Sequence, residues 1–233
     1  MVKRVLLFLL TVVSFSCSND DETVSGLSSY DQNVIEYFCE VALGLEFGSA
    51  PEVTRKWKTT MRIFVGGNKT PALLEELNDI IADINTLATD GFTIDTVTDS
   101  LDLNYYLFFG SGAQYAQIFP SQAGLVKNNW GLFNIFWDGS NQIYSGSMYV
   151  DIERASDLEQ KHLLREELTQ SLGLGKDSGR DPDSIFQIAW TTSSTYANID
   201  EDIIRLLYHP DMETGLARSS TQSLLTQILL SEK

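Results

Sequence analysis

Apolar positions recur at helical spacing in several parts of the chain and alternate with polar positions between them. A repeat of three to four residues predicts a helix over residues 31–46 and a second one with Thr70 as its cap, Pro71 in its first turn and Gly91 as its stop. The same repeat returns in residues 198–208 and 220–230. Helices are therefore expected at both ends of the folded part of the chain.

Shorter segments that are rich in β-branched and aromatic residues predict strands. They cover residues 61–65, 92–97, 104–109, 131–138 and 142–151. A turn at residues 138–141 should join the last two into a hairpin. We expect the aromatic residues of these strands mainly in the core rather than on a carbohydrate-binding platform. Residues 114–120 show no assignable pattern.

Residues 161–177 form the segment in which helical periodicity, ionisable groups and a helix-stopping glycine coincide. At about 100° per residue, Leu164, Leu168 and Leu172 lie on one side of the helix. Three polar residues lie almost opposite them: His162, Glu166 and Gln170. Glu167 falls between the two sides. The segment therefore predicts a helix that buries its leucines and turns a polar face toward a cleft.

The end of this helix resembles the active-site helix of the metzincin metallopeptidases, which carry H-E-x-x-H-x-x-G-x-x-H. In this chain Glu167 stands at the general-base position and Gly173 at the turn glycine, which can supply a left-handed cap as Gly175 also can. The three zinc-ligand positions carry different residues: Glu166, Gln170 and Lys176. Downstream, Phe186 stands where matrixins carry the methionine of their turn, and residues 198–208 resemble their terminal helix.

The same block is similar to a bacterial family known as domain of unknown function 2927, over roughly residues 57–216. The resemblance implies an α+β, zincin-like fold, with a twisted mixed sheet, a backing helix, a central active-site-type helix and C-terminal helices. It also implies an altered site, because zinc sites are built from His nitrogens with a carboxylate or thiolate. We expect no metal and no cofactor, and a cleft face made of His162, Glu166, Gln170 and Asp177.

The N-terminal residues indicate export. Lys3 and Arg4 precede an apolar run that is too short to span a bilayer, and Cys17 follows it. Residues 1–16 resemble a bacterial lipoprotein signal peptide with Cys17 as the lipid-bearing residue. The acidic run after Cys17 resembles the surface-export signal of Bacteroidetes lipoproteins. We expect an outer-membrane, cell-surface lipoprotein held by this anchor, the alternative being a secreted protein cleaved near Ser16.

Charge and composition complete the expected organisation. The formal net charge of −16 opposes binding to nucleic acid or to anionic lipid. The chain has 233 residues and 43% hydrophobic content, which suits one core. We expect a flexible acidic tether at residues 17–29 and a single domain at residues 30–233. Cys39 lies in an apolar repeat and is expected to be a buried small hydrophobe.

Three functions stay open at this point. The first is a surface lipoprotein that does not catalyse a reaction and uses the cleft to bind a peptide, a glycan or a protein. The second is an atypical hydrolase in which Glu166, Gln170 and Asp177 hold calcium or magnesium, less well zinc, with Glu167 as general base. The third is an accessory subunit that docks through the helix at residues 220–230, although we expect this helix to pack on its own domain.

Overall fold

The computed structural model describes residues 26–233. The predicted signal peptide at residues 1–16, the lipidation site Cys17 and residues 17–25 of the predicted tether lie outside this range. Within it, the tether prediction is wrong at its end, because Leu27 is buried and Ser28 caps the first helix. The folded domain therefore begins before residue 30. No helix in the described range is long and apolar enough to cross a membrane.

A mixed sheet of six strands forms the centre of the molecule. The strands are β1 (Lys56–Trp57), β2 (Met61–Gly67), β3 (Ile94–Val97), β4 (Tyr105–Gly110), β5 (Gly131–Trp137) and β6 (Gln142–Asp151). They run in the order β1-β6-β4-β2-β3, all parallel, while β5 pairs antiparallel with β6 alone. The predicted hairpin is confirmed, and β5 lies at one edge of the sheet.

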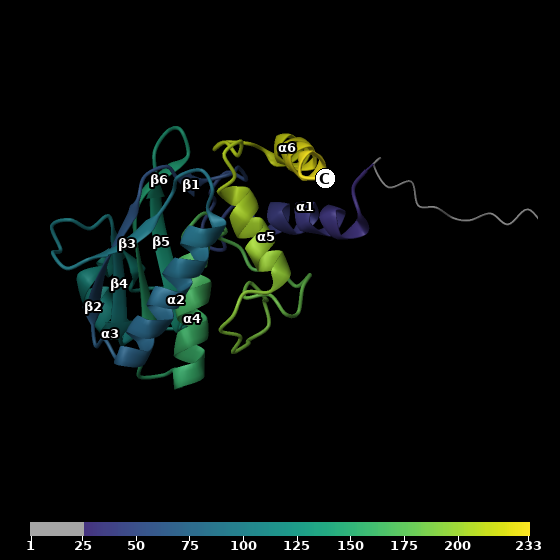
Figure 1. Ribbon diagram of the computed structural model, residues 1–233. Coiled ribbons are helices and arrows are strands. Elements are labelled where there is room, and N and C mark those ends of the chain that lie inside the picture. Colours follow the sequence, from purple (N-terminus) through teal and green to yellow (C-terminus); the bar gives the residue numbers. More distant parts are fainter. Residues whose placement is uncertain (1–25) are drawn as a thin grey trace, which may run out of the picture.

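Helices cover the sheet and extend beside it (Figure 1). They are α1 (Ser29–Ala42), α2 (Pro71–Leu87), α3 (Gly112–Ile118), α4 (Asp157–Gln170), α5 (Asn198–Leu207) and α6 (Arg218–Ser231), with a short 3₁₀ turn at Pro120–Gln122. Figure 1 shows α2 and α4 side by side, with α1, α5 and α6 grouped next to them. The expected class is confirmed: α+β, with a mixed sheet, a backing helix, a long central helix and C-terminal helices.

The strand β4 explains why both faces of the sheet are covered. Tyr105, Leu107 and Phe109 belong to the main core, whereas Phe108 packs with Tyr115 of α3 in a smaller cluster on the opposite face. Successive side chains of a strand point to opposite faces, so an uninterrupted apolar run needs a cover on each side. The helix α3, which the sequence left unassigned, supplies the second cover.

Two helices begin or end at other residues than predicted. The first ends at Ala42 rather than at residue 46, and Gly44 follows with φ of +117°, a conformation that favours glycine. The chain then turns so that Glu46 donates its backbone N–H to the Gly175 carbonyl. The last helix, α6, begins earlier than expected and buries Leu225 and Ile228 against its own domain, as expected. Cys39 is buried, also as expected.

Candidate functional site: a cleft along α4

A cleft of about 490 Å³ runs along the polar face of α4. We call it the α4 cleft. Its walls come from α4 itself, from the segment 128–131 that leads into β5, from the segment 187–190 and from two single residues of other loops, Glu46 and Asp177. Because these parts are far apart in sequence, the cleft exists only in the folded domain. Its volume falls within the range of about 300–1,000 Å³ that is usual for ligand sites.

All four residues of the predicted cleft face line this cavity. His162, Glu166 and Gln170 lie one turn apart on α4, and Asp177 reaches them from the loop after the helix. Glu167 also lines the cleft. Helical spacing puts the first three of these residues on one side of α4, and the tertiary structure forms a cavity beside them.

His162 is held as a hydrogen-bond donor at both ring nitrogens. Its Nδ1 lies 2.7 Å from the Ser193 carbonyl oxygen and its Nε2 lies 3.3 Å from Glu166 Oε2. Burial disfavours the charged imidazolium, but Glu166 and the Ser193 carbonyl outweigh it and raise the pKa of His162 above its usual value. Glu166 and His162 are therefore engaged with each other.

Glu167 is the most deeply placed carboxyl group of the cleft. Its residue is only 9% exposed, and the strand residue Gly131 leaves room for it, because a Cβ there would collide with its side chain. Burial, followed by the negative charges of Glu166, Asp177 and Glu46, raises its pKa well above the usual range. Glu167 therefore holds its proton more tightly than an exposed glutamate does.

Two further carboxyl groups have raised pKa values for the same reasons. Burial, then Glu166 and Glu46, raise the pKa of Asp177 to about 7, although Gln170 donates a hydrogen bond of 2.7 Å to its Oδ1. Burial and Glu166 also raise the pKa of Glu46. The α4 cleft thus contains three neighbouring carboxyl groups with raised pKa values, of which Asp177 has a pKa of about 7.

The residues at the three zinc-ligand positions do not fit a zinc ion. Glu166 is engaged by His162, and the Gln170 amide donates to Asp177 rather than offering its oxygen in common with Glu166. Lys176 does not line the cleft; its Nζ lies 2.9 Å from Glu52. Nowhere in residues 26–233 do three or more His, Cys, Asp or Glu side chains converge as metal ligands would. Neither the nitrogen-donor chemistry nor the geometry of a zinc centre is present in this range.

The turn after α4 is closely packed against other parts of the chain. Gly173 has φ of +119° and lies against the Arg55 carbonyl, where a Cβ would collide. Phe186, which stands at the position of the methionine turn, is fully buried, and its N–H donates to Ser184. Ser184 in turn donates to Asp200 near the start of α5. Gly173 and Phe186 therefore have structural roles at this turn.

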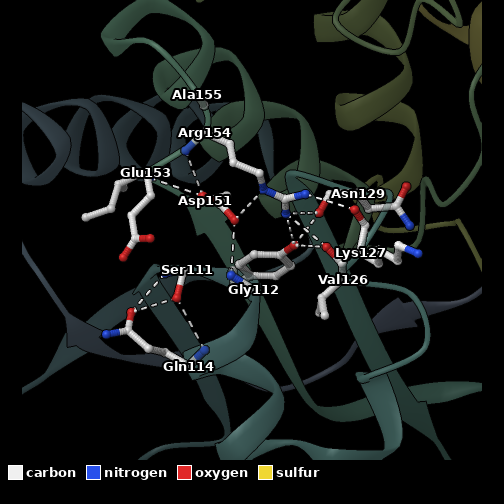
Figure 2. A network of polar contacts seen from close by, with 12 residues as sticks. Ser111, Gly112, Gln114, Val126, Lys127, Asn129, Asp151, Glu153, Arg154 and Ala155 are labelled. Carbon is white, nitrogen blue, oxygen red and sulfur yellow. Dashed lines mark hydrogen bonds and ion pairs between the residues drawn. The ribbon is translucent and has the colours of Figure 1, made fainter.

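The upper rim is held by Arg154, just before α4 (Figure 2). Its guanidinium donates to the carbonyl oxygens of Val126, Lys127 and Asn129, and pairs with Asp151 at 2.8 Å. Figure 2 shows these carbonyls converging on the one side chain. The Tyr149 hydroxyl donates to the Val126 and Asn129 carbonyls as well. Because the carbonyl groups of an irregular segment need donors, Arg154 and Tyr149 together hold the segment that carries Asn128 and Asn129 into the cleft.

The sequence alone missed three parts of the cleft. Glu46 was assigned to a helix, and Trp130 and Trp190 belong to irregular segments without a periodic signal. The two indole rings pack edge to face with centroids 5.3 Å apart, and the Trp190 Nε1 donates to Glu159. No spacing rule connects residues 60 positions apart in sequence, so only the fold could place these rings together.

A comparison with curated proteins finds none that matches the chain. Among solved structures, one titled "Structure of myroilysin" aligns with 12% sequence identity and a TM-score of 0.43, over 67% of this chain and 97% of that one. A family model described as "Protein of unknown function (DUF2927)" matches residues 19–227, and the chain therefore belongs to this family.

Proposed function

We propose that the protein is a surface lipoprotein that does not hydrolyse peptides and that uses the α4 cleft to bind a peptide segment of a partner. The observation that carries this proposal is the state of the three zinc-ligand positions. Glu166 is paired with His162, Gln170 donates to Asp177, and Lys176 lies outside the cleft. A metallopeptidase needs a metal to generate its nucleophile, and these residues offer it no common site.

The raised pKa of Glu167 also supports a protein that does not hydrolyse peptides. A general base has to accept a proton from the attacking water, so its catalytic form is the ionised one. Burial, followed by the negative charges of its acidic neighbours, raises the pKa of Glu167 well above its usual range and so disfavours this ionised form. Without a nearby cation, Glu167 would be a poor base here.

The walls of the cleft favour an extended peptide as the ligand. The strand β5 begins at the cleft with Gly131, and among the described strands it pairs only with β6, so its other edge is not hydrogen-bonded to a strand. Edges of this kind can accept an added strand. The opposite wall exposes Ile188 and Trp190, which are 72% and 60% exposed. A glycan would use the tryptophan but not the strand edge.

The test incubates the full chain with a defined pool of peptides, in excess zinc, in calcium or in chelator. We expect no new peptide termini by mass spectrometry under any condition, while some peptides bind and change the tryptophan fluorescence. A Trp190→Phe variant serves as the control that assigns the signal to the cleft. Cleavage that a chelator stops and that Glu167→Gln abolishes would establish the atypical hydrolase instead.

The lipid anchor is proposed from residues 1–22 and has its own test. In a bacterium that processes lipoproteins and is fed a labelled fatty acid, we expect the full-length protein to carry the label and to sediment with the outer membrane. Cys17→Ala should lose both properties, whereas Ser18→Ala should keep them. Unlabelled wild-type protein in the medium, cleaved near Ser16, would show that the protein is simply secreted.

A further inference from the structure

The charges that line the α4 cleft are strongly unbalanced. Its lining contains five carboxyl groups and one imidazole, with no lysine or arginine: Glu46, Glu159, Glu166, Glu167, Asp177 and His162. Glu159 is engaged by Ser156 and by the Trp190 ring nitrogen, and Glu166 by His162. Within residues 26–233, the other three carboxyl groups form no ion pair.

The position of Glu167 shows that the excess of carboxyl groups extends into the buried part of the cleft and is not confined to a solvated surface. It is nine-tenths buried, it faces the cavity, and it has no side-chain hydrogen-bond partner among the described residues. Burying a carboxyl group without a charged partner is unfavourable. A cation that enters the cleft would give Glu167 such a partner.

The rim adds a surface that suits an organic cation. Trp130 and Trp190 meet edge to face at an interplanar angle of 79°, and Trp190 is 60% exposed. The Trp130 ring already has the Arg154 guanidinium 5.8 Å from its centroid. Tryptophan is the aromatic side chain that attracts cations most strongly. The exposed Trp190 ring is therefore available to cover the stem of a charged side chain that enters the cleft.

We propose that the α4 cleft recognises an arginine side chain of its peptide ligand, with lysine as a weaker substitute. This inference rests on the proposed binding function of the same cleft and names its ligand class. A guanidinium can donate to two carboxylates at once and stack on an indole ring, whereas an ammonium group does neither equally well. A metal ion would need convergent oxygen ligands at about 2.3–2.6 Å, and the described residues form no such group.

Binding should be coupled to loss of protons. The groups that face the ligand are Glu46, Glu166, Glu167 and Asp177, with His162 and Glu159 at the edges. Burial, followed by neighbouring acids, raises the pKa of Asp177 to about 7 and also raises the pKa values of Glu46 and Glu167, so an entering cation favours the loss of protons from these groups. Arginine itself stays charged throughout. The affinity should therefore rise with pH between about 5 and 8 because the cleft ionises.

The experiment uses three end-blocked fluorescent hexapeptides of alanine and serine with one central arginine, lysine or citrulline. Citrulline has nearly the shape of arginine without its charge. Fluorescence anisotropy with the full chain at pH 8 should show the arginine peptide binding at least about tenfold more tightly than the citrulline peptide. Asp177→Asn and Glu46→Gln should remove most of this preference. Glu201→Gln, an exposed acid on α5, is the matched control and should leave it unchanged.

The outcomes separate this inference from the proposed function. Equal affinity for the arginine and citrulline peptides would overturn the charge recognition and leave peptide binding standing. If neither peptide binds at any concentration tested, both proposals fail. Stoichiometric calcium binding by calorimetry that Asp177→Asn abolishes would show a metal site and would overturn the arginine proposal. Melting temperatures of each variant verify that the isosteric changes leave the fold intact.

Discussion

Replacing Arg165 with alanine is expected to lower the free energy of unfolding by about 3–5 kcal/mol. Arg165 is buried on α4 and lies 3.0 Å from Glu76 and 2.8 Å from Asp83, both on the backing helix α2. Its guanidinium also lies 4.6 Å from the centroid of the Tyr196 ring. The substitution leaves Glu76 buried, with only Lys161 at 3.4 Å as a remaining partner among the described residues. Urea unfolding followed by circular dichroism measures the loss.

Two controls test the physical reason for this loss. Glu76→Gln added to Arg165→Ala should recover part of it, since the uncompensated buried charge is then gone. Arg218→Ala removes an ion pair whose partners are 48% and 44% exposed, and should cost under about 1 kcal/mol. A loss below about 1 kcal/mol for Arg165→Ala would contradict the view that this pair attaches the cleft helix to its support.

Asp177→Asn is expected to stabilise the protein at pH 8, and by progressively less as the pH falls. The pKa of Asp177 is raised by burial and by acidic neighbours, from 3.8 to about 7. The folded state therefore holds its proton more tightly than the unfolded state, and the stability from that proton is complete below about pH 4. It is lost as the pH rises through about 7. A shift of about three pKa units corresponds to about 4 kcal/mol.

Three other carboxyl groups of the cleft interact electrostatically with Asp177. Their own protonation will change when Asp177 is replaced, and this change will offset part of the gain in stability. We expect about 2–4 kcal/mol at pH 8 and no difference at pH 4, from urea unfolding at each pH. Asn can still accept the hydrogen bond from Gln170, so the change is isosteric. Asp79→Asn, an exposed acid on α2, should show no such pH dependence. A gain that is equal at both pH values would refute the electrostatic explanation.

These two substitutions test different parts of the protein, the support of the helix α4 and the lining of the cleft. Arg165 supports the helix from behind and does not line the cleft, so its loss weakens the scaffold. Asp177 lies in the cleft, where the protein retains a group that costs it stability at neutral pH. Destabilising groups of this kind are commonly retained where a ligand needs them. The predicted gain in stability and the predicted loss of arginine binding in Asp177→Asn should therefore occur together.

Local chemistry identifies several elements from the amino-acid sequence alone. Thr70 and Pro71 begin α2 because a hydroxyl cap and a fixed φ suit the first turn of a helix. The hairpin β5–β6 follows from two alternating segments around a short turn. The helix α3 was not predicted, because its 7 residues are too few to show a helical repeat. Its capping box at Ser111 and Gln114 also precedes no long apolar repeat.

The sequence by itself determined the polar face of α4, since a period of 3.6 residues places His162, Glu166 and Gln170 on one side in any context. It also places Glu166, Gln170 and Lys176 at the three positions where the metzincin motif that it resembles carries histidines. Only the tertiary structure decided that Glu46 and Trp190 join that face, that Lys176 leaves it, and that Asp177 takes a proton. Those outcomes depend on contacts between residues far apart in sequence and on burial. Neither can be read from the residues next to the side chain in the sequence.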